Sequence, residues 1–186
     1  MISEYTRFPA PVDDGAAHGL EGKLLPEVEL EASTGGRVDL ARAAPRLVLY
    51  VYPSATGTPH LPTPDWAQIP GAIGCTAESC SFRDRRGSFD SLGVTVMGLS
   101  AQTGEAQRAF AARKDINFTL LSDAELRLAG DPGLPTFSAG NFRLYRRLSL
   151  FAESGQITKV WYPVFPPDTH PVAVLDWVQG HLERGQ

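Results

Sequence analysis

The chain has 186 residues, which suits one globular domain and is short for two. It is 42% hydrophobic and 20% charged, with a net charge of −4 and no block of basic residues, so neither a nucleic-acid-binding nor a membrane-surface protein is expected. The most apolar run, Leu47 to Tyr52, is far shorter than the ~20 residues that span a bilayer. The first residues do not resemble a secretory leader, which predicts a cytoplasmic location.

The first part of the chain predicts an arm followed by a hairpin. Residues 1–21 contain several Pro and Gly without an apolar period, and we expect an N-terminal arm that precedes a domain over 22–186. Polar and apolar residues alternate over 28–31 and 37–40 on either side of Gly35-Gly36. This pattern predicts two short strands joined by a turn.

Apolar strands and helix-like segments alternate over the rest of the chain. The nearly continuous apolar segments 46–52 and 93–99 are typical of strands buried on both faces. The other expected elements are strands at 118–121, 148–151 and 157–162, and helices at 76–91, 103–115, 123–130 and from about Thr169 or His170 onward. This order predicts a three-layer α/β domain with a mixed central sheet.

One long segment contains no expected element. Residues 54–74 hold four prolines and two internal glycines and follow neither the helical nor the strand period. Segments of this length without regular structure are uncommon in compact domains and are often functional. Both a tolerated surface insertion and a wall of a pocket fit its composition, and its place between a buried strand and a helix favours the pocket wall.

The two cysteines occupy the start of the expected helix 76–91. Cys75 lies at its N-terminus, where unpaired N–H groups and the helix dipole favour a thiolate. Cys80 is five residues further on, and over an intact helix that spacing separates the Cα atoms by roughly 8 to 9 Å. A disulfide needs about 4.4 to 6.8 Å, so the pair can join only if the first turns unwind. A merely buried, structural Cys80 remains an alternative, while no zinc template and no CxxC motif matches.

The segment from Pro70 to Asp84 reads PGAIGCTAESCSFRD and resembles the active-site segment of the peroxiredoxins. It is closest to the Q-type, or bacterioferritin-comigratory, branch, whose pattern is PGCTxxxCxFRD. The resemblance covers about residues 22–184, including Gly22 to Pro26, Tyr50 to Pro53, 93–100, 118–123 and Arg147 to Ser149. It implies a thioredoxin-like α/β/α fold with an N-terminal hairpin.

The resemblance also implies roles for individual residues. Cys75 would be the peroxidatic cysteine, Cys80 the resolving cysteine, and Arg147 the cation beside the thiolate, with Arg146 as a substitute one position out of register. The implied activity is the reduction of hydrogen peroxide or organic hydroperoxides through a sulfenic acid, which an intramolecular Cys75–Cys80 disulfide resolves. A thioredoxin- or glutaredoxin-type protein would be the reductant, the chain would act as a monomer or homodimer, and neither cofactor nor metal is implied.

One departure from the family pattern affects the expected site. The family motif PxxxTxxC places a threonine hydroxyl at the thiolate, but counting back from Cys75 gives Ala72 at that position. Thr56, or else Thr58, would have to reach the site from the insertion 54–74. The departure keeps two alternatives open, a one-cysteine peroxidase with a structural Cys80 and a non-catalytic redox sensor on the same fold.

Overall fold

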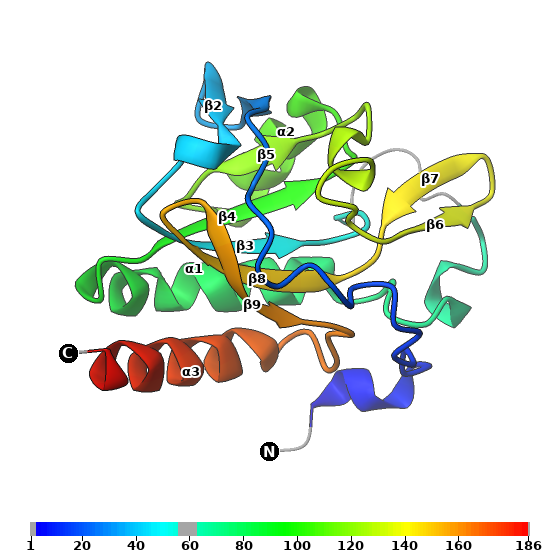
Figure 1. Ribbon diagram of the computed structural model, residues 1–186. Coiled ribbons are helices and arrows are strands. Elements are labelled where there is room, and N and C mark those ends of the chain that lie inside the picture. Colours follow the sequence, from blue (N-terminus) through cyan, green and yellow to red (C-terminus); the bar gives the residue numbers. More distant parts are fainter. Residues whose placement is uncertain (1–2, 56–62, 186) are drawn as a thin grey trace.

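The computed structural model describes residues 3–55 and 63–185 (Figure 1). A seven-stranded sheet lies at its centre, with the strand order β2-β1-β5-β4-β3-β8-β9. β3 pairs in parallel with β4 and β4 with β5, while the remaining neighbours are antiparallel. The strands are β1 (Glu29–Ala32), β2 (Arg37–Asp39), β3 (Arg46–Val51), β4 (Thr95–Ser100), β5 (Leu120–Ser122), β8 (Leu148–Glu153) and β9 (Gln156–Trp161). The mixed sheet and the N-terminal hairpin predicted from the sequence are confirmed.

The central strand β3 is buried on both faces because its side chains alternate between two apolar clusters. Val48 and Tyr50 point into one cluster, and Leu47 and Leu49 into the other, each with no more than 1% of its surface exposed. A strand without a solvent-facing side reads as a continuous apolar run, which is how this segment appears in the sequence.

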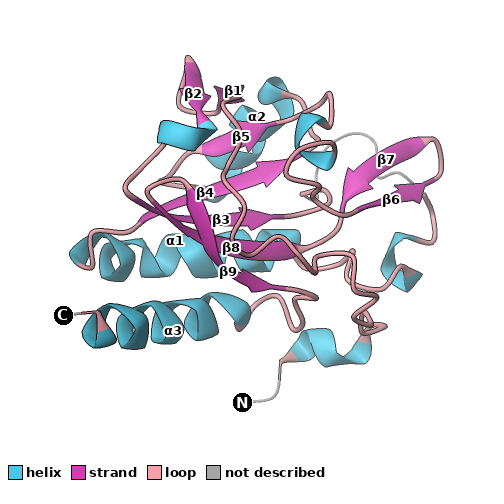
Figure 2. Cartoon of the chain, viewed as in Figure 1, coloured by secondary structure: helices cyan, strands magenta, loops and turns pink. Residues whose placement is uncertain are grey.

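Three helices cover one face of the sheet (Figure 2). These are α1 (Cys75–Ser91), α2 (Gly104–Lys114) and α3 (His170–Arg184), and α1 and α3 lie side by side. The other face is covered by residues 17–25 and by the 3-10 turns η2 (Leu40–Arg42) and η4 (Arg127–Ala129). Within the described residues, no helix is long and apolar enough to cross a bilayer.

The helix predicted over 123–130 is wrong, since only the turn η4 forms there. The buried Asp123 carboxylate accepts hydrogen bonds from the backbone N–H of Arg127 and Leu128, at 3.1 and 3.0 Å, and from the Tyr145 hydroxyl at 2.6 Å. A side chain that satisfies these N–H groups replaces the carbonyl partners that a helix would supply.

A second hairpin was not predicted. β6 (Thr136–Ala139) and β7 (Phe142–Tyr145) pair in antiparallel register around Gly140 and Asn141. The hairpin packs against the segment that precedes α1, where the short turn η3 (Trp66–Gln68) buries Trp66 with its ring centroid 6.3 Å from that of Phe137. Trp66 thus anchors the end of the Pro-rich segment to the rest of the domain.

Candidate active site

The ends of three elements meet at one edge of the sheet. β3 ends at Val51, and α1 begins at Cys75. β8 runs antiparallel to β3 with Leu148 opposite Val51, so the residue before β8, Arg147, lies at the same edge as the end of β3. The carboxyl ends of parallel strands are where open α/β sheets bind their ligands.

Cys75 is the first residue of α1 and is almost fully buried, with 1% of its surface exposed. The chain enters the helix through Gly74, whose φ of +103° lies in the region that glycine tolerates. The thiol therefore lies among the unpaired N–H groups and the positive end of the helix dipole, both of which favour a thiolate.

Arg147 is the cation at this thiol. Its Nη2 donates to Cys75 Sγ at 3.0 Å, and its Nη1 pairs with Glu78, one helical turn beyond Cys75. Burial alone would lower the pKa of Arg147, but the neighbouring Cys75 and Glu78 outweigh it and the pKa is raised. The guanidinium is thus charged and held at the sulfur.

Backbone carbonyls fix the orientation of this guanidinium. The carbonyl of Gly71 accepts from Nε of Arg147 at 3.2 Å, and those of Ala72 and Ile73 accept from Nη2 at 3.3 and 3.2 Å. The turn before α1 therefore serves as a cradle for Arg147. A guanidinium, with donors in a fixed plane, fits such a cradle better than an ammonium group.

Glu78 is a buried carboxylate with an incomplete set of partners. It has no exposed surface, and among the described residues its Oε1 has no hydrogen-bond partner. Burial raises the pKa of Glu78 to about 7, although the pair with Arg147 acts in the opposite direction. Near neutral pH the Glu78 carboxyl therefore gains and loses a proton while it pairs with Arg147, the cation that also contacts Cys75.

Hydroxyl groups brace the first turn of α1 from the sheet side. The Ser79 hydroxyl donates to the Cys75 carbonyl at 2.9 Å, and the Tyr50 hydroxyl donates to Ser79 at 3.0 Å. Burial raises the pKa of Tyr50 well above its usual value, so the phenol stays protonated and remains a donor. This chain of bonds ties the thiol-bearing turn to β3.

A buried imidazole also lies near Arg147. His170, the first residue of α3, contacts the Ser149 hydroxyl at 2.8 Å. Burial, together with the nearby Arg147 cation, lowers the pKa of His170 to about 3. The imidazole is therefore neutral at physiological pH, and Arg147, not His170, is the charged group that contacts the thiol.

A sequence model of the redoxin family matches residues 20–176 of the chain. The chain belongs to the redoxin family. It is 27% identical to chloroplastic peroxiredoxin Q of Triticum aestivum over 95% of this chain and 77% of the wheat protein. It is 29% identical to peroxiredoxin Bcp of Escherichia coli K12 over 86% of this chain and 96% of the bacterial protein. The crystal structure of peroxidoxin BcpB from Mycobacterium tuberculosis superposes with a TM-score of 0.71 at 25% identity, over 88% of this chain and 98% of that one.

These similarities make the protein a peroxiredoxin of the Q or Bcp kind, an oxidoreductase that acts as a thiol peroxidase, with the thioredoxin-like fold of that group. In this peroxiredoxin the structure brings Cys75 and Arg147 into contact. Cys80, half-buried, lies further along the same continuous helix, and both cysteines are free thiols.

The other candidates from the sequence lie elsewhere. Arg146 points to Asp14 of the N-terminal arm, at 3.5 Å, and not to the thiol. Ala72 occupies the position of the family threonine, and its carbonyl oxygen lies 3.5 Å from Cys75 Sγ. Thr56 and Thr58 lie outside the described residues.

Sequence reasoning overlooked Glu78. An acidic residue three positions after the cysteine lies on the same helix face, which is a usable signal. The signal is incomplete, however, because the cation that makes Glu78 part of the site is 69 residues away in the chain.

Proposed function

We propose that this peroxiredoxin reduces hydroperoxides with Cys75 as the peroxidatic and Cys80 as the resolving cysteine. The observation that carries the proposal is the 3.0 Å contact between Arg147 Nη2 and Cys75 Sγ in a buried site at a helix N-terminus. A positioned guanidinium stabilises both the thiolate and the negative charge that develops on the peroxide oxygens.

In the first step the Cys75 thiolate attacks one peroxide oxygen of ROOH. An S–O bond forms and the O–O bond breaks, so the sulfur loses two electrons and the peroxide gains them. The second oxygen leaves as alkoxide, or as hydroxide from hydrogen peroxide, and takes up a proton. The product is a Cys75 sulfenic acid.

In the second step the Cys80 sulfur attacks the Cys75 sulfur, and water leaves as the disulfide forms. The two residues lie on one continuous helix, where their Cα atoms are roughly 8 to 9 Å apart, so the first turns of α1 must unwind. The disulfide lies within one chain, and the cycle needs no second subunit.

A thioredoxin- or glutaredoxin-type dithiol then reduces the disulfide by exchange through a mixed disulfide. We place this cycle in the cytoplasm, where such systems keep thiols reduced.

Intact mass spectrometry of the reduced protein after one equivalent of hydrogen peroxide, with thiol trapping at short times, tests the proposal. The wild type should lose two hydrogens and retain no trappable thiol, whereas Cys80→Ser should gain one oxygen at Cys75, and Cys75→Ser should not react. A wild type that gains oxygen and keeps one trappable thiol would instead be a one-cysteine enzyme. Absence of any reaction with hydrogen peroxide and with cumene hydroperoxide would refute the peroxidase assignment of these residues.

A further inference from the structure

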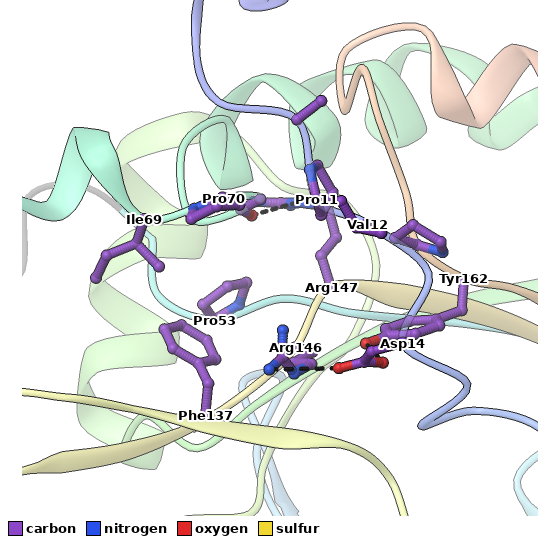
Figure 3. Close-up of a pocket in the computed structure, with 13 residues that line it drawn as sticks. Pro11, Val12, Asp14, Pro53, Ile69, Pro70, Phe137, Arg146, Arg147 and Tyr162 are labelled. Carbon is purple, nitrogen blue, oxygen red and sulfur yellow. Dashed lines mark hydrogen bonds and ion pairs between the residues drawn. The ribbon is translucent and has the colours of Figure 1, made fainter.

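The N-terminal arm, residues 3–19, runs along the edge of the active site (blue in Figure 1), although it precedes the residues that match the redoxin family. Pro11 packs so closely on Gly71 that a Cβ at Gly71 would lie 3.4 Å from the proline ring, and Figure 3 shows Pro11 beside Pro70. Gly71 belongs to the turn whose carbonyls hold Arg147. The arm therefore contacts the start of the segment that leads into α1.

The arm also reaches the other end of that segment. Its 3-10 turn η1 (Glu4–Arg7) carries Tyr5, and a Cβ at Gly74 would lie 3.2 Å from the Tyr5 ring. The same Cβ would collide with Pro167, which is buried in the loop between β9 and α3. Gly74, the residue directly before Cys75, is thus packed against both Tyr5 and Pro167.

Polar bonds fasten the arm in this position. The Ser3 hydroxyl donates to Asp168 at 2.6 Å and accepts from the backbone N–H of Tyr5 at 3.1 Å, so one side chain caps η1 and ties it to the loop before α3. Further along the arm, Asp14 accepts from the Tyr162 hydroxyl at 2.7 Å (Figure 3). The Tyr5 ring is therefore held in place from both sides along the chain.

The packing at Gly74 bears on the second step of the proposed cycle, in which the first turns of α1 unwind. The backbone N–H of Glu78 donates to the Gly74 carbonyl at 2.9 Å, which closes the first turn of this helix. Since Cys75 cannot leave this turn without displacing Gly74, unwinding also breaks the packing of Tyr5. A contact that exists only in the wound helix lowers the population of the unwound state, and with it the rate of any reaction that proceeds from that state.

We infer that Tyr5 is a positioning residue that holds the first turn of α1 wound and thereby lengthens the life of the Cys75 sulfenic acid before Cys80 attacks it. The inference rests on the proposed function. In the attack the Cys80 sulfur supplies an electron pair to the Cys75 sulfur, the S–S bond forms and the S–O bond breaks, and the hydroxide takes up the thiol proton and leaves as water. Tyr5 takes no part in these bonds and acts only on the step that brings the two sulfurs together.

Amide hydrogen exchange of the reduced protein, followed by NMR, tests the inference without any peroxide. In Tyr5→Ala the Glu78 amide should exchange about fivefold faster than in the wild type, which corresponds to about 1 kcal/mol. The Gly98 amide, which donates to the Thr119 carbonyl at 3.1 Å within the sheet, should keep its rate, whereas a loss of stability of the whole domain would accelerate both. Tyr5→Phe is the matched control: burial raises the pKa of Tyr5, so the phenol is uncharged, and a phenyl ring should pack in the same way.

Quenched-flow mass spectrometry after one equivalent of hydrogen peroxide measures the effect on the cycle. Conversion of the sulfenic acid to the disulfide is a first-order step, so its rate is obtained separately from that of the reaction with peroxide. Tyr5→Ala should form the disulfide about fivefold faster, and Ser3→Ala, which releases η1 from Asp168, at least about twofold faster. Arg7→Ala, in the same turn, is the control: its exposed side chain lies over the Phe8 ring at 5.0 Å, and the rate should not change.

The outcomes separate this inference from the proposed function. If either rate is unchanged in Tyr5→Ala while the wild type forms its disulfide, the inference is refuted and the peroxidase stands. Equal acceleration of the Glu78 and Gly98 amides would also refute it, because Tyr5 would then only stabilise the domain as a whole. If the wild type forms no disulfide, the proposed function itself fails, and the exchange of the Glu78 amide still decides whether Tyr5 holds the helix wound.

Discussion

The buried carboxylate of Glu78 gives the stability of this protein a specific dependence on pH. Its pKa rises from an ordinary 4.5 to about 7 in the folded chain, mainly because the group is buried. The folded state therefore holds this proton more tightly than the unfolded state. The stability linked to the proton is fully present below pH 4.5 and is lost as the pH rises through about 7. The difference between 4.5 and about 7, at roughly 1.36 kcal/mol per pKa unit, amounts to about 3 kcal/mol.

Glu78→Gln removes this dependence. The amide has nearly the shape of the protonated acid, and its carbonyl oxygen can still accept from Arg147, but it does not titrate. At pH 5 the free energy of unfolding of the variant should exceed that of the wild type by no more than about 1 kcal/mol, because Glu78 is then ionised mainly in the unfolded state. At pH 8 it should be more stable by about 3 kcal/mol, because the wild type then carries a buried carboxylate.

Urea unfolding of the reduced proteins at pH 5, 6, 7 and 8 measures this difference. Comparing wild type and variant at each pH cancels the contributions of the titrating groups that do not interact with Glu78. Glu105→Gln, at an exposed position in the first turn of α2, serves as control and should shift stability by no more than about 0.5 kcal/mol. A gap between Glu78→Gln and wild type that is the same at pH 5 and pH 8 would refute the reasoning.

Three further predictions concern the surroundings of the thiol. The pKa of His170 is lowered from 6.5 to about 3, so its neutral imidazole stabilises the folded state above pH 6.5, and this stability is lost as the pH falls towards 3. Between pH 6.5 and pH 4, the free energy of unfolding of His170→Gln should therefore fall by about 3 kcal/mol less than that of the wild type, as measured by acid unfolding. Gly74→Ala should lower the free energy of unfolding by at least about 2 kcal/mol, because a Cβ at φ +103° is strained and collides with Pro167. Gly87→Ala is the control: a Cβ there meets open space, and the substitution should not destabilise α1. Arg147→Met should slow single-turnover oxidation by hydrogen peroxide about 10²- to 10³-fold, and a rate within threefold of wild type would contradict its place at the reacting sulfur.

The layers of the fold could be predicted because their signals are local. The central strands read as continuous apolar runs, and the closing helix α3 shows its apolar spacing and an early Pro171. The helix predicted at 123–130 failed because Asp123 is bonded through its side chain to its own turn and to Tyr145, which lies 22 residues further on. The β6–β7 hairpin was missed although alternating residues flank Gly140-Asn141, a pair typical of tight turns.

The candidate site was predictable only in part, because only some of its signals are local in the sequence. Its helix N-terminus can be recognised around Cys75, and the resemblance supplied Arg147 as a candidate. The partners of these residues depend on tertiary placement: Glu78 becomes part of the site only because β8 delivers Arg147 beside it. Likewise, nothing near Asp14 in the sequence indicates Tyr162, which is 148 residues away.

Arg147 has two tasks that variants can separate. It compensates the buried Glu78 carboxylate, and it holds the Cys75 sulfur. Arg147→Met should cost about 3 to 5 kcal/mol of stability near pH 8, the usual result of removing one partner of a buried ion pair. Adding Glu78→Gln should restore most of that loss, since no buried carboxylate is then left without its cation. The double variant should nevertheless oxidise as slowly as Arg147→Met, because the thiolate still lacks the guanidinium that stabilises it and the leaving oxygen. Recovery of the oxidation rate together with the stability would mean that Arg147 acts only by keeping the site folded.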